Sequence, residues 1–314
     1  MELSRRTFLV SVAGLAASGA IGEFYLNNEL MEKPPVDKIV NGKKYVLADL
    51  HVHVDGDIAK NNPGSVVDLL SSGLTAMTEG RNHVLNYDQA LELCAHNGAT
   101  FREIERGLLA EVIQGDKKGY VLRAQEVYSS HHILSVGCTR FIDPSLQPER
   151  VVEEIRKYGG ISILVHPYIL NSHGGKLPRI ANSEEEKMAR SLAQIADEIE
   201  IFNGHCIDLA PSTMLPTDMK YAQLGWLKRM NERARKLADS VGKKGIASSD
   251  AHDFVDQAKT SGIYVPESNL SIASLQEAIA TGDFMQEKRY ISRWSFLKSR
   301  FYELPVGNGN AKQI

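Results

Sequence analysis

Residues 48–53 read Ala-Asp-Leu-His-Val-His, which places His51 and His53 at the end of an apolar run. Residues 248–252 read Ser-Ser-Asp-Ala-His and repeat the same spacing with Asp250 and His252. Alternate side chains of a β-strand project to the same face, so the two members of each pair point in the same direction. Each pair can hold one side of a metal ion, and the two stretches together predict a metal centre at strand ends.

Three further candidate ligands, Glu126, His132 and His166, each lie beside an apolar, β-branched run. A single His-x-His pair is more often solvent-facing or hydrogen-bonded than bound to a metal. A second pair and three more candidates in the same setting favour a metal site, because surface histidines have no reason to choose strand ends. Imidazole and carboxylate ligands together suit zinc, manganese or iron better than calcium or magnesium. The set is typical of a metal-dependent hydrolase.

Apolar strand candidates alternate with amphipathic helix candidates from residue 45 onward, which indicates an α/β fold. Polar residues gather at the strand C-termini, as they do in barrel enzymes, so we predict a seven-stranded barrel. Two long loops, residues 171–182 and 204–224, are expected to shape substrate selection. The predicted strands are residues 45–54, 74–79, 120–127, 133–137, 161–165, 198–202 and 245–249, and the predicted helices are residues 87–95, 148–158, 183–196, 225–241 and 271–280.

The composition indicates one large globular domain. The chain has 314 residues, of which 43% are hydrophobic and 24% charged, and its formal net charge is -3. This near-neutral balance supplies no broad basic face for a nucleic-acid backbone, so nucleic acid is not a predicted partner. A small-molecule substrate is the expected ligand.

The N-terminus resembles a twin-arginine export signal. Arg5 and Arg6 directly precede Thr-Phe-Leu-Val and a small-residue apolar run over residues 11–21. The run is too short for a typical membrane-spanning helix. We therefore predict export by the twin-arginine machinery to the periplasm or the outside of the cell, with an uncleaved, membrane-anchoring signal as the alternative. The predicted divisions are a signal peptide (1–22), a linker (23–44), a metallohydrolase domain (45–303) and a flexible tail (304–314).

Several motifs resemble those of the polymerase-and-histidinol-phosphatase (PHP) superfamily of metal-dependent hydrolases. Residues 49–53 are similar to its first motif, 125–126 to its third, 165–167 to its fourth and 249–252 to its last, and residues 200–203 resemble its penultimate strand. The resemblance implies a distorted (β/α)7 barrel that holds two or three divalent metal ions and hydrolyses, most often, phosphate esters. Hydrolysis of an amide or carbamate, and a noncatalytic metal-binding barrel, stay open as alternatives.

The resemblance also implies a role for each ligand. His51, His53, Glu126 and Asp250 would hold one ion, and Glu126, His132 and His166 its neighbour, so that Glu126 bridges the two. Two adjacent cations lower the pKa of a shared water, and the resulting hydroxide would be the nucleophile. His252, with Glu79 or Asp57, would complete a third ion position or donate a proton to the leaving group. The expected catalytic residues are Glu126, Asp250 and His252.

The second motif departs from the family pattern. The family usually has Thr-Asp-His there, whereas this chain has Thr78-Glu79-Gly80. Glu79 can replace the aspartate as a ligand, and His83 could reach in from the following turn, but neither restores the usual geometry by itself, so a third ion is expected to be absent or weakly bound. Arg81 and Arg140 are candidates for binding a substrate anion, because a guanidinium group matches phosphate or carboxylate.

Overall fold

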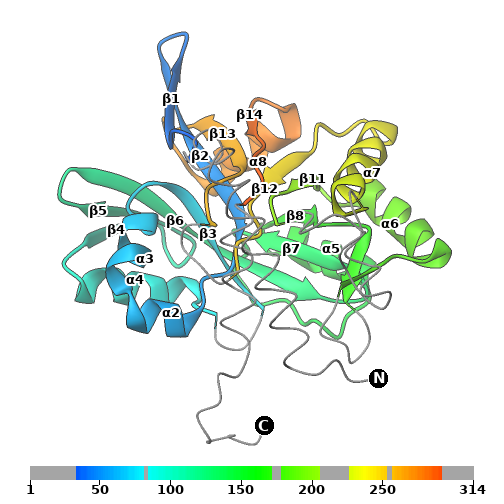
Figure 1. The fold of residues 1–314 in the computed structure, drawn as a ribbon, viewed down its shortest axis with the longest axis horizontal. Coiled ribbons are helices and arrows are strands. Elements are labelled where there is room, and N and C mark those ends of the chain that lie inside the picture. The colour runs from blue at the N-terminus through cyan, green and yellow to red at the C-terminus, as the bar shows by residue number, and fades with distance from the viewer. Residues whose placement is uncertain (1–32, 81–83, 172–177, 206–225, 253–256, 292–314) are drawn as a thin grey trace, which may run out of the picture.

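The computed structural model describes residues 33–80, 84–171, 178–205, 226–252 and 257–291. The predicted signal and tail, together with Arg81 and His83, lie outside these residues. The described part is a mixed α/β fold whose strands form a nearly closed, barrel-shaped sheet with helices on its outer side (Figure 1). The predicted fold class, a distorted α/β barrel, is confirmed.

All seven predicted strands are present. The seven follow the order β12-β11-β8-β7-β6-β3-β2 in the sheet, which continues from β2 into β13 (Gly262–Pro266) and β14 (Met285–Glu287). Val52, at the end of β2, also forms a parallel bridge with Ala251, and the His53 backbone N–H donates to the Ala251 carbonyl at 2.7 Å. This bridge brings the first and last motifs side by side. The predicted strands are β2 (Lys43–Val52), β3 (Gly73–Glu79), β6 (Lys117–Tyr128), β7 (His132–Val136), β8 (Ile161–Leu164), β11 (Glu198–Asn203) and β12 (Ile246–Ser248).

Strand β7 breaks the regular strand-helix repeat. It runs antiparallel to both of its neighbours, β6 and β8, whereas β2, β3 and β6 are mutually parallel. Tyr128 pairs with His132, so β6 and β7 form a hairpin. A parallel connection needs a crossover of about a dozen residues, and the loop between these two strands is far shorter. His132 therefore starts a strand instead of following one, but it still lies at the end of the barrel where β6 finishes.

The five predicted helices are confirmed as α4 (Tyr87–His96), α5 (Pro148–Lys157), α6 (Ser183–Ile195), α7 (Trp226–Ser240) and α8 (Ile272–Thr281). Asn86, Asn182 and Ser271 form capping boxes at the starts of α4, α6 and α8, which explains these three boundaries. Two short helices, α2 (Gly56–Asn61) and α3 (Pro63–Leu70), were not predicted. No described helix has the length and apolar character needed to cross a membrane.

Further strands extend the sheet beyond the seven. Strand β13 runs antiparallel to β2, and β4 and β5 form a hairpin that continues from β6. Strand β1 and the start of β2 occupy residues 37–44, within the predicted linker. The strands that extend this sheet are β1 (Asp37–Val40), β4 (Thr100–Glu105), β5 (Leu109–Gln114), β13 (Gly262–Pro266) and β14 (Met285–Glu287). Strands β9 (Ile169–Asn171) and β10 (Pro178–Ile180) form a separate two-stranded sheet.

A β-bulge in β2 determines which way its histidines face. The register against β3 shifts between Asp49 and Val52. Leu50 packs in the buried cluster that includes Ala124, Leu134 and residues of α8, whereas Val52 packs in a different cluster with Met77. Leu50 and Val52 thus lie on opposite faces, although they are two residues apart. A bulge re-aims side chains in this way, and it leaves His51 and His53 on the face opposite Val52.

Candidate metal centre

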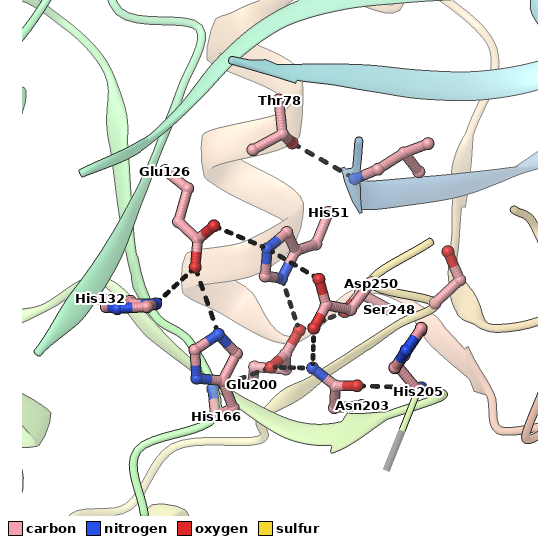
Figure 2. A network of polar contacts seen from close by, with 12 residues as sticks. His51, Thr78, Glu126, His132, His166, Glu200, Asn203, His205, Ser248 and Asp250 are labelled. Atoms are coloured by element: carbon pink, nitrogen blue, oxygen red, sulfur yellow. Dashed lines mark hydrogen bonds and ion pairs between the residues drawn. The ribbon is translucent and has the colours of Figure 1, made fainter. Parts of the chain in front are cut away.

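Side chains from three strands (β2, β6 and β7) and from the turns that follow β2, β8 and β12 converge at one end of the barrel (Figure 2). They form four overlapping groups, and within each group the ligand atoms lie within 4.8 Å of one another. Seven of the eight predicted metal ligands belong to these groups. The groups are His51, His53 and Glu126; His51, His166 and Asp250; His53, Asp250 and His252; and Glu126, His132 and His166.

Glu126 lies at the centre, and its two carboxylate oxygens face different histidines. Oε1 is 2.7 Å from His132 Nδ1 and 3.2 Å from His166 Nε2. Oε2 is 3.2 Å from His53 Nε2 and 3.8 Å from His51 Nε2. We call the side with His51, His53 and Asp250 the first position and the side with His132 and His166 the second position. A carboxylate placed in this way can serve both positions.

The atoms of the first position suit a cation. His51 Nδ1 is 3.0 Å from the Glu200 carboxylate, so its proton belongs on Nδ1 and Nε2 carries a lone pair. That Nε2 is 3.2 Å from His53 Nε2 and 3.3 Å from Asp250 Oδ1. Within the described residues, Asp250 Oδ1 is buried without a hydrogen-bond partner. A buried carboxylate oxygen requires a partner, and a divalent ion would provide one for these three atoms together.

The electrostatics of the cluster agree with a cation site. Burial alone would raise the pKa of Asp250, but the surrounding histidines, above all His51, outweigh it and hold this pKa well below its usual range. Burial lowers the pKa of His166, yet the carboxylates of Glu126, Asp250 and Glu200 together outweigh burial and raise it to about 9. Buried carboxylates therefore attract positive charge here. Protons and a metal ion compete for the same nitrogen atoms, so ion binding is expected to weaken as the pH falls.

Two ligands adopt backbone conformations that are uncommon for residues other than glycine. His166 has a φ of 27° and Asp250 a φ of 51°. Such strain persists only where the surrounding structure imposes it, and it concentrates at functional sites. Asp250 is held through Asn203, whose Nδ2 donates to Asp250 Oδ2 at 2.8 Å. His166 is held by its own backbone N–H, which donates to Glu200 at 2.8 Å.

Sequence reasoning missed the polar residues behind the ligands. Glu200 is fully buried, and its carboxylate accepts hydrogen bonds from His51, His166, Asn203 and Ser248. The available signal was an acidic residue between two isoleucines in the predicted strand 198–202. It was recognised only as part of a strand that resembles one of the family's.

His252 lies at the edge of the cluster. Its ring centroid is 4.8 Å from that of His53 and 5.1 Å from that of His205, which follows β11. His252 Nδ1–H donates a hydrogen bond to the Asp250 carbonyl oxygen at 2.7 Å. His252 thus groups with His53 and Asp250, not with Glu79 or Asp57 as predicted.

Glu79 does not join the cluster. It pairs in register with Gln125 and so shares the sheet face of Gln125, opposite that of Glu126. With Gln125, Arg123 and Arg140 it lines a small surface hollow. Burial raises its pKa, and the charges that act on it are those of Arg123 and Asp88. The resemblance to the second motif identified Glu79, but it did not indicate that Glu79 lies on the sheet face away from the metal ligands.

Asp57 and Arg140 are also placed away from the ligands. The Asp57 side chain is 75% exposed in the first turn of α2, where it contacts Lys60 at 3.2 Å. Arg140 follows β7 and lines the hollow with Glu79 and Gln125, on the face of the sheet opposite Glu126. Its guanidinium group is exposed and lies 4.8 Å from the ring centroid of Tyr158. The substrate role predicted for Arg140 conflicts with this placement.

A match to a known protein family falls on the last motif. Residues 228–254, which include most of α7, all of β12 and the ligands Asp250 and His252, match a family described as PHP-associated. No curated protein matches the chain. PHP proteins are typically metal-dependent hydrolases, and the buried His, Asp and Glu groups are consistent with that dependence. The match and the ligand groups together support the assignment of this chain to the PHP superfamily.

Proposed function

We propose that this protein is a metal-dependent hydrolase that acts on phosphate esters. The observation that carries the proposal is the position of Glu126, whose two oxygens face two separate sets of histidines. This arrangement suits two adjacent divalent cations of zinc, manganese or iron. Such a pair, when bound, would activate a water molecule and neutralise charge on the substrate oxygens.

The side chains would divide the remaining work. Glu126 and Asp250 are buried and bring negative charge to the ligand set. They would therefore hold the cations next to the substrate bond that is hydrolysed. His252 lies at the edge, where a leaving group could reach it. Because His252 Nδ1–H is hydrogen-bonded to the Asp250 carbonyl, proton transfer from His252 to a leaving group would take place at Nε2.

A substrate screen tests the proposal. Metal-free protein would be reconstituted separately with zinc, manganese and iron and assayed with chromogenic phosphate monoesters, phosphate diesters, amides and carbamates. Phosphate-ester turnover that is lost on chelation supports the proposal. Turnover of amides or carbamates alone would assign the alternative hydrolase class. Firm ion binding without turnover of any class would indicate a noncatalytic metal-binding barrel.

One observation favours the amide or carbamate alternative. A phosphate substrate gains from a guanidinium group beside the cations, and Arg140 lies away from the ligands, next to Tyr158. Arg81, the other arginine predicted to bind substrate, is outside the described residues. The variant Arg81→Gln tests whether this arginine binds a substrate phosphate group. If it does, the KM for phosphate esters should rise.

We further propose that the protein is exported through its N-terminal residues. The support is the sequence alone, in which Arg5-Arg6 directly precedes an apolar run. Residues 1–40 would be fused to a reporter that is active only outside the cytoplasm. The double substitution Arg5→Lys and Arg6→Lys should abolish reporter activity, because twin-arginine recognition requires the guanidinium pair. Unchanged export would contradict the proposal.

A further inference from the structure

Glu200 contacts ligands of both cation positions. Its Oε1 accepts from His51 Nδ1 at 3.0 Å and from the Ser248 hydroxyl. Its Oε2 accepts from the His166 backbone N–H at 2.8 Å and from Asn203 Nδ2 at 3.1 Å. One fully buried carboxylate thus joins residues from β2, β11 and β12 with the turn after β8 (Figure 2).

The two oxygens act on their ligands in different ways. Oε1 holds the His51 proton on Nδ1, and this tautomer leaves the Nε2 lone pair directed at His53 and Asp250. Oε2 binds no side-chain atom of His166. It holds the backbone of His166 in its left-handed conformation, while the Glu126 carboxylate faces the ring at Nε2.

We propose that Glu200 is a positioning residue for both cation positions, setting the first through the tautomer of His51 and the second through the backbone of His166. The inference rests on the proposed metal-dependent function. It concerns ion binding, however, so a protein that binds ions in this way and hydrolyses nothing would refute the function and leave the inference standing.

The variant Glu200→Gln separates the two actions. A glutamine places an NH2 group at one of the two oxygen sites. At the Oε2 site this group would face two donors that cannot reverse, because the His166 N–H is fixed and Asn203 Nδ2 also donates to Asp250. At the Oε1 site the Ser248 hydroxyl can rotate and His51 can change tautomer. The NH2 group is therefore expected at Oε1, where it moves the His51 proton to Nε2.

Titration of metal-free protein with Zn²⁺ measures the consequence. Glu200→Gln should weaken the first position by about 10- to 100-fold, the usual effect of removing a hydrogen-bond partner of a ligand, and leave the second near its normal affinity. Glu200→Ala removes both contacts and should weaken both positions. Glu198→Gln is the matched control, since Glu198 is also buried on β11 but accepts a hydrogen bond from Ile199, not from a ligand. It should bind both ions normally.

Two results would overturn the proposal. One is unchanged affinity at the first position in Glu200→Gln, and the other is an equal loss at both positions in that variant. A measurement on the wild-type protein covers the case in which the variants do not fold. The nitrogen chemical shifts of His51 in the metal-free protein should report a proton on Nδ1, and the opposite tautomer would contradict the role of Oε1.

Discussion

Asp49 accepts two hydrogen bonds from Ser249, one from the backbone N–H at 3.0 Å and one from the hydroxyl at 2.5 Å. The two residues are 200 positions apart in the chain. Each lies two residues or fewer from a candidate metal ligand, so the pair holds the first motif against the last. Asp49 also accepts from the Lys259 backbone N–H at 2.8 Å, and it is fully buried.

The variant Asp49→Asn should destabilise the protein by about 1–3 kcal/mol, because its NH2 group must face a buried backbone N–H at either oxygen site. Urea denaturation of metal-free protein measures this loss. Asp197→Asn is the matched control: Asp197 also accepts from the backbone and hydroxyl of one serine, Ser162, but its side chain is 35% exposed. Water can replace its contacts, so a smaller loss is expected. Equal losses of unfolding free energy in the two variants would show that the buried contacts of Asp49 contribute no more than the exposed contacts of Asp197.

Glu126→Gln and Asp250→Asn should each lower kcat by more than about 10²-fold with little change in fold, the scale of loss when a key electrostatic group is removed. Each substitution keeps the shape of the side chain and removes a negative charge from the ligand set. The assay is the turnover of whichever substrate the screen identifies, with circular dichroism as the check on folding. Near-normal turnover in both variants would contradict the two-ion mechanism.

Local patterns predicted much of the fold and the ligand set. The alternation of side chains along a strand correctly paired His51 with His53, and the strand ends indicated Glu126, His132 and His166. Those signals lie within a few residues of the ligands they identify. The capped helices were found for the same reason, since caps are local.

Features that depend on register or on tertiary packing could not be read in this way. The face of Glu79 depends on its pairing with Gln125, which no local pattern reveals. The location of Arg140 depends on the direction of β7, and the seven-strand pattern did not specify that direction. Glu200 was missed because its importance comes from residues brought to it by three other parts of the chain.

Lys259 should make stability depend on pH. Burial lowers the pKa of its ammonium group from 10.5 to about 7, and the charge of Lys33 adds to the effect. Between these two pH values the unfolded chain binds a proton that the folded protein does not, so the free energy of unfolding should rise with pH. Below about pH 7 both states are protonated, and the full cost of burying the charge remains.

The variant Lys259→Met removes this titration. The free energy of unfolding is measured for both metal-free proteins from pH 7 to 9. Over this range the wild type should become more stable relative to the variant by up to about 1.4 kcal/mol per pH unit. Lys157→Met is the control, because the Lys157 side chain is 58% exposed. Parallel pH profiles for wild type and Lys259→Met would show that the lysine stays charged when buried.

The stoichiometry of tight binding should be about two ions per chain, because the first and second positions have protein ligands enough for closed or nearly closed sites. His252 shares His53 and Asp250 with the first position and gains neither Glu79 nor Asp57. A third ion would thus lack ligands of its own. Elemental analysis after dialysis against a mild chelator checks the number, and a firmly held third equivalent would contradict it.

Restoring a histidine at Gly80 should weaken the centre instead of adding a third ion. Gly80 has a φ of 150°, and a Cβ built there would lie 2.6 Å from the Glu126 carbonyl oxygen and 2.8 Å from the Tyr128 ring. The backbone of the central ligand occupies the space that a side chain would need, so Gly80→His must displace Glu126.

Gly98→His is the control, since Gly98 also has a positive φ, of 80°, but faces open space. Gly98→His carries a left-handed backbone penalty of about 1–2 kcal/mol, so a chelator competition on both variants separates backbone cost from damage to the ligand set: only Gly80→His should lose zinc affinity. A gain of a third tight equivalent in Gly80→His would show that Glu126 and Tyr128 can make room, and that the missing histidine alone keeps the third position empty.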